Sequence, residues 1–493
     1  MRIWIIILAV AAAAPLQAQT DLRWVNRIGS NGFDGGFAVA VDSTDAIYAG
    51  GHFVGTTDFD PGPGVAELTA TIEDPFLVRY DSGGGLIWAK HLVGRGTVTD
   101  IAVDSNDDVL VVGDFVGSLV VDAMLTLTAT NQNRDLFVIK FDSSGNRIWG
   151  FALGGDGVDV PQDIALDSTD ALILSGTIGV SADLDPGIGV FEVEADIDED
   201  SFVAKYTSNG DFAWGELFEQ MTPSGLSQSD SARGLAVDAM DAVFVSGLFE
   251  GQVDFGGTVL DAGGTDAYIA KLNSAGVVQW VIATESAGLR TEHFSLGIDQ
   301  VGNLYAAGMF FGEPDFDPDP VDQALANSNS TLDVYLVSYD ATGDFRWVSH
   351  LSTPGTLEVF DLLVRADGSS TVAGQFSGTA DFDPGPGTEL RTASPSDAYF
   401  AHYDSSGALI SAQHLERISG GSFLTNGIQS LAPAAGGQMV AVGSFRTNVD
   451  FDPGPGVVSV LPTAGSPDVF VARYGDPLPP EIFKDGFEQP QIR

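Results

Sequence analysis

Short runs of apolar residues, many of them alternating with polar ones and separated by turn-forming clusters, dominate this chain. "FAVAVD", "AIYAGGHF", "PFLVRYD" and "LIWAKHL" follow one another between residues 37 and 92, and each is rich in Val, Ile or aromatic residues. Clusters such as "DSTD" and "DSGGG" lie between them. This pattern is typical of β-strands joined by tight turns. No segment between Asp21 and Tyr474 has helical periodicity, so the pattern predicts an all-β chain.

The four-run unit recurs along the chain, and three independent markers count it. Tryptophans recur at intervals of 61 to 67 residues, at Trp24, Trp88, Trp149, Trp214, Trp280 and Trp347, with Ser411 in the seventh position. A Gly-x-aromatic (or Gly-x-Ile) marker starts at Gly51, Gly113, Gly176, Gly247, Gly308, Gly374 and Gly443. An aspartate opens a short apolar run at Asp74, Asp135, Asp200, Asp266, Asp333, Asp397 and Asp468. Each marker indicates seven units.

Seven units of four strands predict a seven-bladed β-propeller with four-stranded antiparallel blades, because radial repetition lets each sheet bury both faces. A solenoid of stacked β-repeats is the alternative, although a repeat of about 65 residues is long for a solenoid coil. The expected domain spans residues 20–475. Its blades cover about 36–93, 99–153, 162–218, 233–284, 294–351, 360–415, and 428–475 together with 22–28.

The chain ends predict how such a ring closes. The first strand, "LRWVNRI" from Leu22, carries the tryptophan that marks a fourth strand, whereas the last, "DVFVARY", corresponds to a third strand. We therefore expect residues 22–28 to pair antiparallel with residues 469–474 and to complete the last blade. This pairing would protect an edge that otherwise has unpaired amides.

The quoted markers resemble the bacterial seven-bladed β-propeller repeat family of the SBBP type. Its units carry an Ala-Val-Asp strand, a Gly-x-Phe, an Asp-x-Phe-Val-x-Lys strand and a Gly-x-x-x-Trp strand. Blades 1, 3 and 5 match most fully, while blade 7 has "LAPAAGG" in place of the first strand and turn. The resemblance implies an exported, often surface-associated repeat protein and no particular reaction.

Composition and the first residues agree with an exported protein. The 21 Lys and Arg against 68 Asp and Glu give a net charge of −47, which disfavours binding to nucleic acid and anionic membranes. "MRIWIIILAVAAAAPLQAQT" has the features of a secretory signal peptide, so residues 1–19 are expected to be removed. No later apolar run is long enough to span a bilayer. We therefore expect a secreted, extracellular or cell-surface monomer, with the periplasm as the other compartment.

One acidic motif, "TTDFDPGPGV" from Thr56, occurs five times in close copies. Asp-Pro-Gly has the chemistry of a turn, since Asp caps, Pro presets φ and Gly accepts positive φ. The motif predicts a hairpin between the second and third strands, with the aromatic or Leu residue packed and the carboxylates facing water. The alternative is a weak Ca²⁺ site, although Ca²⁺ needs six to eight oxygens. The candidate ligands are Asp58, Asp60, Asp183, Asp185, Asp315, Asp317, Asp381, Asp383, Asp450 and Asp452.

We expect structural roles for the other recurrent residues. The tryptophans are expected to pack between blades, with sugar stacking as the alternative. The marker glycines are expected to permit close backbone approach. The seven third-strand aspartates are expected to cap backbone amides, with a carboxylate ring as the alternative. The tail, residues 476–493, contains "IFKDGFE", which is either a sorting signal or a frayed end.

Catalytic motifs are absent from the sequence. The six histidines share no spacing and no motif, and there is no cysteine, Gly-x-Ser-x-Gly or HExxH. The first strands of the units are expected to start at Ala38, Asp100, Asp163, Gly234, Ser295, Asp361 and Ser430. Asp100, Asp163 and Asp361, alongside Arg233 and His293, are therefore the candidate catalytic cluster at the channel mouth. We expect a non-catalytic scaffold for an unknown protein or glycan ligand, and a hydrolase or lyase is the alternative.

Overall fold

Antiparallel β-strands make up the fold. The computed structural model describes residues 20–195, 199–221, 230–284, 290–319, 323–324, 326, 328, 332–419, 427–446, 448–454, 460–461 and 466–475. Within these ranges there is no α-helix, and two 3₁₀ turns, η1 (Thr130–Gln132) and η2 (Ala435–Gly437), are present. No helix in this part of the chain is long and apolar enough to cross a membrane. The all-β prediction is confirmed. The expected signal peptide and the tail lie outside the described residues.

Most strands form four-stranded antiparallel groups, which we number 1 to 7 along the chain. Group 1 contains β2 (Gly35–Val41), β3 (Ile47–Asp58), β4 (Glu67–Tyr80) and β5 (Leu86–His91). Group 2 contains β6 (Gly96–Val103), β7 (Val109–Val116), β10 (Arg134–Phe141) and β11 (Arg147–Asp156). Group 3 contains β12 (Val160–Leu166), β13 (Leu172–Ile178), β16 (Asp200–Tyr206) and β17 (Phe212–Gln220). Group 4 contains β18 (Ser231–Val237), β19 (Val243–Phe255), β20 (Thr258–Leu272) and β21 (Val278–Ala283).

The second half of the chain continues the same order. Group 5 contains β22 (Arg290–Ile298), β23 (Leu304–Phe311), β24 (Asp333–Tyr339) and β25 (Phe345–Leu351). Group 6 contains β26 (Leu357–Val364), β27 (Ser370–Asp381), β28 (Leu390–Tyr403) and β29 (Leu409–Leu415). Group 7 contains β31 (Gly427–Ala434), β32 (Gln438–Phe445), β35 (Asp468–Gly475) and β1 (Asp21–Ile28). Short strands occupy the connections: β8 (Ser118–Val120), β9 (Thr126–Thr128), β14 (Ser181–Asp183), β15 (Glu192–Glu194), β30 (Arg417–Ser419), β33 (Asn448–Asp450) and β34 (Val460–Leu461).

The two ends of the described chain meet in group 7. β1 pairs antiparallel with β35, from Asp21 opposite Gly475 to Ile28 opposite Val469. The carboxylate of Asp468 accepts a hydrogen bond from the Arg27 guanidinium at 2.6 Å. The expected pairing of residues 22–28 with 469–474 is confirmed.

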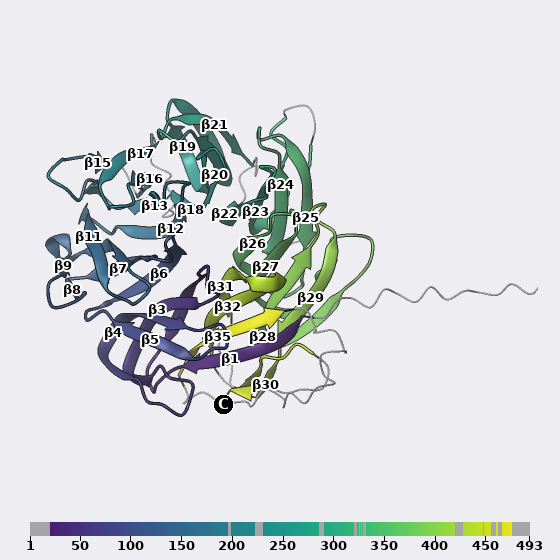
Figure 1. Cartoon of the computed structure of the whole chain (residues 1–493). Helices are drawn as coiled ribbons and strands as arrows, with labels where there is room; N and C mark the ends of the chain where they lie inside the picture. Colours follow the sequence, from purple (N-terminus) through teal and green to yellow (C-terminus); the bar gives the residue numbers. More distant parts are fainter. Residues whose placement is uncertain are drawn as a thin grey trace, which may run out of the picture.

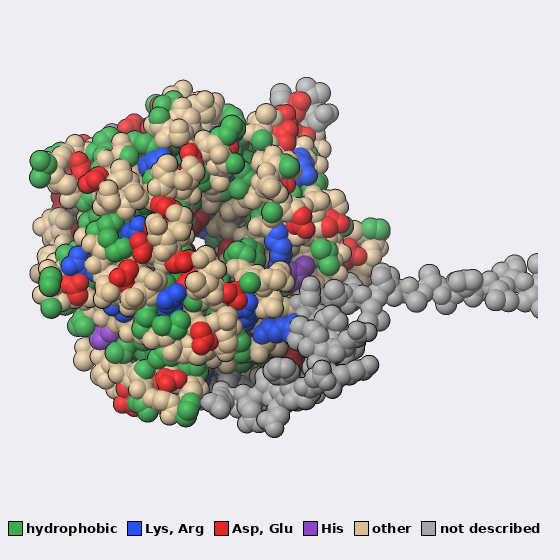
Figure 2. All heavy atoms as spheres, in the orientation of Figure 1, with side chains coloured by type: hydrophobic (Ala, Val, Ile, Leu, Met, Phe, Trp, Pro, Cys, Tyr) green, Lys and Arg blue, Asp and Glu red, His purple; other side chains and the backbone are tan. Residues whose placement is uncertain are grey.

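The groups are arranged around a common centre (Figure 1). Their first strands contact one another in the order β2, β6, β12, β18, β22, β26 and β31, and β31 contacts β2 again. The space-filling view shows a narrow opening in the middle of this arrangement (Figure 2). Seven hydrophobic clusters each combine buried side chains from two neighbouring groups. Burial of apolar side chains between groups therefore holds the assembly together, at roughly 1.5–3 kcal/mol for each large side chain.

The marker glycines lie where the first and second strands of a group approach most closely. A methyl group on Gly51 would collide with the carbonyl oxygen of Gly35, and one on Gly308 would collide with that of Glu292. The equivalent glycines of the other groups face first-strand carbonyls in the same way. The prediction that these glycines permit close backbone approach is confirmed.

Candidate functional site

The three candidate catalytic aspartates lie inside the first strands, not at their starts. β6 begins at Gly96, β12 at Val160 and β26 at Leu357, so Asp100, Asp163 and Asp361 each follow three or four strand residues. In each strand the residue immediately before the aspartate has no partner opposite it, and the pairing register shifts there. The expected strand starts were wrong because this bulge breaks the alternation of apolar and polar residues, which hides the first part of the strand.

Each of these carboxylates connects its own first strand to the next group. Asp100 accepts the Ile164 amide at 2.9 Å, Asp163 the Leu235 amide at 2.6 Å, and Asp361 the Leu431 amide at 2.6 Å. In each case the following group has a residue at the position equivalent to the aspartate, and the amide donor is the next residue along the chain. Asp361 also accepts the Ser295 hydroxyl at 3.0 Å, which extends the connection to group 5. The carboxylates therefore act as latches between adjacent groups, and we call them the latch aspartates.

The surrounding protein desolvates the carboxylates of the latch aspartates and so changes their acidity, although each residue keeps some exposed surface. Desolvation raises the pKa of Asp361 to about 6, although three hydrogen bonds to its carboxylate oppose the shift. Desolvation also raises the pKa of Asp100 and Asp163, whose side chains hydrogen-bond each other. The negative charge of Asp361 adds to the effect on Asp163. Asp100 and Asp163 therefore share a proton more readily than two separate surface carboxylates would.

The pH dependence of stability should reveal the raised pKa of the Asp361 latch. Because Asp361 binds its proton more readily when folded than in an unfolded chain, where its pKa is 3.8, it adds stability as the pH falls from 7 toward 4. Asp361→Asn cannot gain from protonation. The unfolding free energy of the native chain relative to this variant should rise by about 1 kcal/mol between pH 7 and pH 5, measured by urea denaturation.

Asp367→Asn is the matched control for this measurement. Hydrogen bonds from Ser369 lower the pKa of the exposed Asp367 carboxyl, so it stays ionised in both states across this range. Its contribution should not change between pH 5 and pH 7. An equal difference at both pH values for Asp361→Asn would contradict the raised pKa of Asp361 in the folded chain.

Arg233 and His293 do not complete a catalytic group with the latch aspartates. Arg233 lies at the bulge of β18, where its guanidinium contacts Glu292 at 2.9 Å and stacks over Phe294 at 4.7 Å. The His293 side chain is 1% exposed, and its Nδ1 lies 3.1 Å from the carbonyl oxygen of Tyr268. Burial lowers the pKa of His293 to about 3. Its imidazole is therefore neutral and directed into the core between groups.

The motif "TTDFDPGPGV" forms a hairpin turn in which the aspartate carboxylates accept hydrogen bonds from backbone amides. In group 1 the hairpin continues β3 and β4 directly, with one register shift after Phe53, so it extends these strands rather than being inserted between them. Asp58 accepts the amides of Asp60 and Ala66 at 3.0 and 2.8 Å. Asp60 accepts the amide of Gly62 at 2.7 Å.

The other copies repeat these bonds, and the expected packing of the intervening residue is confirmed. Asp183, Asp315, Asp381 and Asp450 accept the amide two residues on, as do Asp185, Asp317, Asp383 and Asp452. The intervening Phe59, Leu184, Phe316, Phe382 and Phe451 are at most 1% exposed. In each copy a tyrosine hydroxyl from the third strand donates to the backbone carbonyl of this residue. The carboxylates are partly buried caps and do not simply face water.

Calcium should have little effect on these hairpins. Among the described residues, no three carboxylates or imidazoles come together where they could hold a metal ion. We predict that chelation shifts the melting temperature by no more than a few degrees, and that another salt at equal ionic strength acts as strongly as millimolar Ca²⁺. A large calcium-specific shift, lost on changing Asp58, Asp183, Asp381 and Asp450 to Asn, would contradict the turn interpretation.

The recurring tryptophans pack between groups, as expected. The Trp88 indole N–H donates to the Ser143 carbonyl in the turn between the third and fourth strands of the next group, at 3.0 Å. Trp24, Trp149, Trp214 and Trp347 make the same bond at 3.0 to 3.1 Å. A glycine with positive φ lies under the ring in each case, for example Gly145 at φ 82°. A side chain at this glycine would be both strained and blocked by the indole.

The third-strand aspartates are buried and have several kinds of partner, with no single shared geometry. Asp135, Asp200 and Asp397 accept backbone amides, as expected, but the donors lie 5 or 20 residues away and not in a local turn. Asp74 and Asp333 instead contact the Nε2 of His91 and His350, at 2.6 and 2.7 Å.

The histidine contacts correct the expectation that the histidines share no spacing. His414 lies 3.8 Å from Asp397, in the arrangement that His91 and His350 have with their aspartates. The three histidines occupy one position on the fourth strand. The repeated "AKHL", "VSHL" and "AQHL" was the signal for it.

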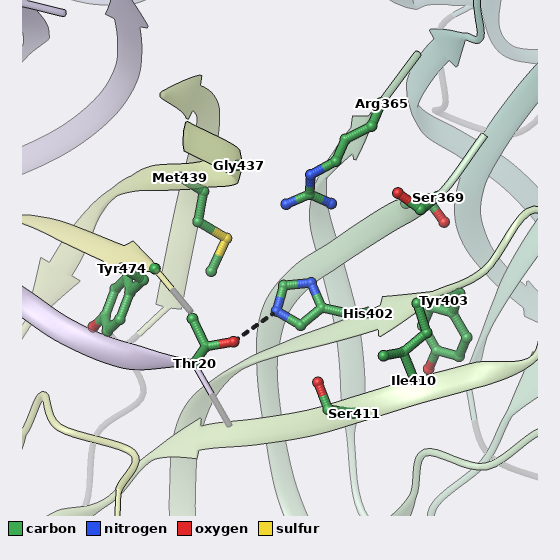
Figure 3. Close-up of a pocket in the computed structure, with 12 residues that line it drawn as sticks. Thr20, Arg365, Ser369, His402, Tyr403, Ile410, Ser411, Gly437, Met439 and Tyr474 are labelled. Atoms are coloured by element: carbon green, nitrogen blue, oxygen red, sulfur yellow. Dashed lines mark hydrogen bonds between the residues drawn. The ribbon is translucent and has the colours of Figure 1, made fainter. Parts of the chain in front are cut away.

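A departure from the repeat lies between groups 6 and 7. A cavity of about 290 Å³ opens there beside His402, Ser411 and Met439, on the side of the molecule where Thr20 leads into β1 (Figure 3). The imidazole of His402 lies between two hydroxyls, with Nδ1 2.7 Å from Thr371 Oγ1 and Nε2 3.3 Å from Thr20 Oγ1. Burial and the charge of Arg365 lower the pKa of His402 to about 4, so its imidazole is neutral at pH 7. The sequence pattern identified Ser411 as a departure but not this cavity.

Comparison with known proteins gives distant likenesses. No protein-family model matches the chain. An uncharacterized WD repeat-containing protein of Acanthamoeba polyphaga mimivirus is 22% identical over 97% of this chain, which spans 40% of that protein's length. A solved polysaccharide lyase is 10% identical over 89% of this chain and 90% of its own, with a TM-score of 0.43. A Bacteroides caccae protein of unknown function is 10% identical over 69% of this chain and 89% of its own, with a TM-score of 0.34. The description of this fold therefore rests on its own strand pairing.

Proposed function

We propose that this chain is a closed seven-bladed β-propeller of the SBBP type, exported from the cell, that serves as a non-catalytic scaffold for binding a protein or glycan. The seven groups correspond to the blades, and the unbroken order of first-strand contacts supports the closure. The pairing of β1 with β35 supports a joint made from both ends of the domain. A repeat-based relative agrees with this architecture.

The observation that carries the non-catalytic proposal is the use of the latch aspartates. Asp100, Asp163 and Asp361 each accept a backbone amide from the following group. A catalytic carboxylate must be available to the substrate or to a reacting water. These three side chains instead stabilise the contact between first strands, and each hydrogen bond of this kind contributes about 1–3 kcal/mol.

A binding screen with matched variants tests the scaffold. The native chain would be applied to a panel of glycans and envelope components, with and without Ca²⁺, and each ligand found would be tested against the variant with all three latch aspartates changed to Asn. We expect the variant to be less stable yet to bind with unchanged affinity below its melting temperature. We propose that the ligand binds away from the latch aspartates, and loss of binding in a folded variant would overturn this.

A hydrolase or lyase is the second candidate, and one observation favours it. Asp100 and Asp163 lie on the neighbouring first strands β6 and β12 and interact with each other, and desolvation raises the pKa of both, as a general acid requires. An enzyme of this kind would cleave a polysaccharide, and Asp163→Asn would abolish turnover while the far-ultraviolet spectrum stayed unchanged. Turnover that survives this substitution, or no turnover on any panel member, would exclude the enzyme.

A further inference from the structure

Four side chains fill the interface between groups 1 and 2, on the side of the turns that join first to second and third to fourth strands. Asp42 and Arg79 form an ion pair at 2.5 Å. The Tyr48 ring packs edge-on against Trp88 at 5.9 Å, and the Arg79 guanidinium lies 5.2 Å from the Tyr48 ring centre. Two aromatic rings therefore fill this interface, and the charges of one acidic and one basic side chain balance each other there.

The same four positions between groups 6 and 7 hold Arg365, Thr371, His402 and Ser411. The registers are equivalent, because Tyr48 pairs with Arg79 as Thr371 pairs with His402, and Arg79 pairs with Trp88 as His402 pairs with Ser411. Two hydroxyl residues thus replace two aromatic rings. The acid is replaced by a base. Groups 2, 3 and 4 keep the acid, with the ion pairs Asp104–Lys140, Asp167–Lys205 and Asp238–Lys271.

The joint between the chain ends explains why the tryptophan is missing at this place. At five other positions the indole donates to a serine carbonyl in the turn between the third and fourth strands of the next group. Group 7 has no such turn, because its fourth strand is β1 and not a continuation of β35. An indole at position 411 would therefore lack both its acceptor and the turn on which it rests.

The resulting cavity has a positive group and no acidic one on its wall. It measures about 290 Å³, at the lower end of the size of ligand pockets, and suits one ring rather than an extended chain. Figure 3 shows the Arg365 guanidinium pointing toward His402 and Met439. Among the described residues that line it, none is Asp or Glu, although the chain carries a net charge of −47. Arg365 donates to the Thr371 hydroxyl at 3.0 Å, and its charge adds to the Ser369 hydrogen bonds that lower the pKa of the exposed Asp367 in the same turn. The guanidinium is therefore partly neutralised and keeps other N–H groups that can donate to a ligand.

From this geometry we infer that the cavity, which we call the seam pocket, binds a small ring carboxylate. The ring would occupy the space of the missing indole, beside Met439 and the exposed Ile410. The carboxylate would face Arg365, whose planar guanidinium matches a carboxylate in two-point contact. The hydroxyls of Ser411 and Thr20 would hydrogen-bond substituents on the ring. This site is separate from the channel and from the hairpins.

Titration of the full chain with simple probes tests the seam pocket. Benzoate and glucuronate each combine a ring with a carboxylate, acetate lacks the ring, and benzamide and glucose lack the charge. By ligand-observed NMR or calorimetry we expect at least one ring carboxylate to bind at least tenfold more tightly than acetate and than its neutral counterpart. Tighter binding of benzoate would identify an aromatic acid, and tighter binding of glucuronate a sugar acid.

Two variants and a control locate the binding. Ser411→Trp fills the cavity and should abolish binding, while Arg365→Gln keeps the volume and should weaken binding at least tenfold. Arg147→Gln removes an equal charge from an ion pair with Asp122 in group 2, and should leave affinity within twofold. The proposal is overturned if no ring carboxylate binds at millimolar concentration, if acetate binds as tightly, or if a folded Arg365→Gln variant binds like the native chain.

Discussion

Without residues 19–30 the chain should fail to form a stable group 7, and it should aggregate or be rapidly proteolysed. β35 would lose its antiparallel partner and expose a row of unpaired amides, which is the usual template for intermolecular pairing. Ile28, which is fully buried, would leave the cluster that joins group 7 to group 1. Trp24 and Asn26 would also lose their bonds to the carbonyls of Ser82 and Gly84 in group 1. Both neighbours of the joint are therefore weakened.

Limited proteolysis and light scattering measure this effect. Removal of residues 479–493, which lie outside the described part of the chain, is the control and should change little. A synthetic peptide of residues 19–30 should restore protease resistance to the shortened chain, because it can supply the missing strand. A shortened chain that stays monomeric and as stable as the native one would contradict the joint.

Trp88→Ser should cost about 3 kcal/mol of unfolding free energy, at the low end for loss of a large aromatic side chain because the ring is half-buried. The variant copies position 411 into an interface that retains Tyr48, Arg79 and the turn around Gly145. It removes the bond to the Ser143 carbonyl and the edge contact with Tyr48. The loss should appear in urea denaturation as a lower midpoint.

The neighbouring residue provides the control for this substitution. Ile87 is 46% exposed and lies on the opposite side of the strand, so Ile87→Ser should cost less than about 0.5 kcal/mol. Equal losses for Ile87→Ser and Trp88→Ser would show that the tryptophan does not close the interface.

Local patterns predicted those features whose partners are near in sequence. The Asp58 turn was predictable because the capped amides lie two and eight residues away. The joint was predictable because Trp24 marks β1 as a fourth strand. The latches were not, because Asp100 bonds an amide 64 residues further on and the bulge obscures the start of its strand. Only the placement of one group beside the next brings such atoms together.

The seam pocket required the structure for a related reason. Ser411 was visible as a missing tryptophan, but one small residue can be compensated by a larger neighbour. The cavity exists because Thr371 and His402 depart from the pattern on adjacent strands, and its charge exists because Arg365 replaces an acid. A comparison of equivalent positions across all groups, rather than of one marker at a time, would have revealed the coincidence of the four changes.

The joint between β1 and β35 also constrains the order of folding. Arg27 and Asp468 lie 441 residues apart in sequence, so the last group cannot form until nearly the whole chain has been synthesised. Until then β1 has no partner, whereas groups 1 to 6 can each assemble from contiguous sequence. A circular permutant in which β1 follows Gly475 through a short linker would make every group local in sequence. Its folding rate and stability, compared with those of the native chain, would separate the effect of the contacts between groups from the effect of pairing β1 with β35 last.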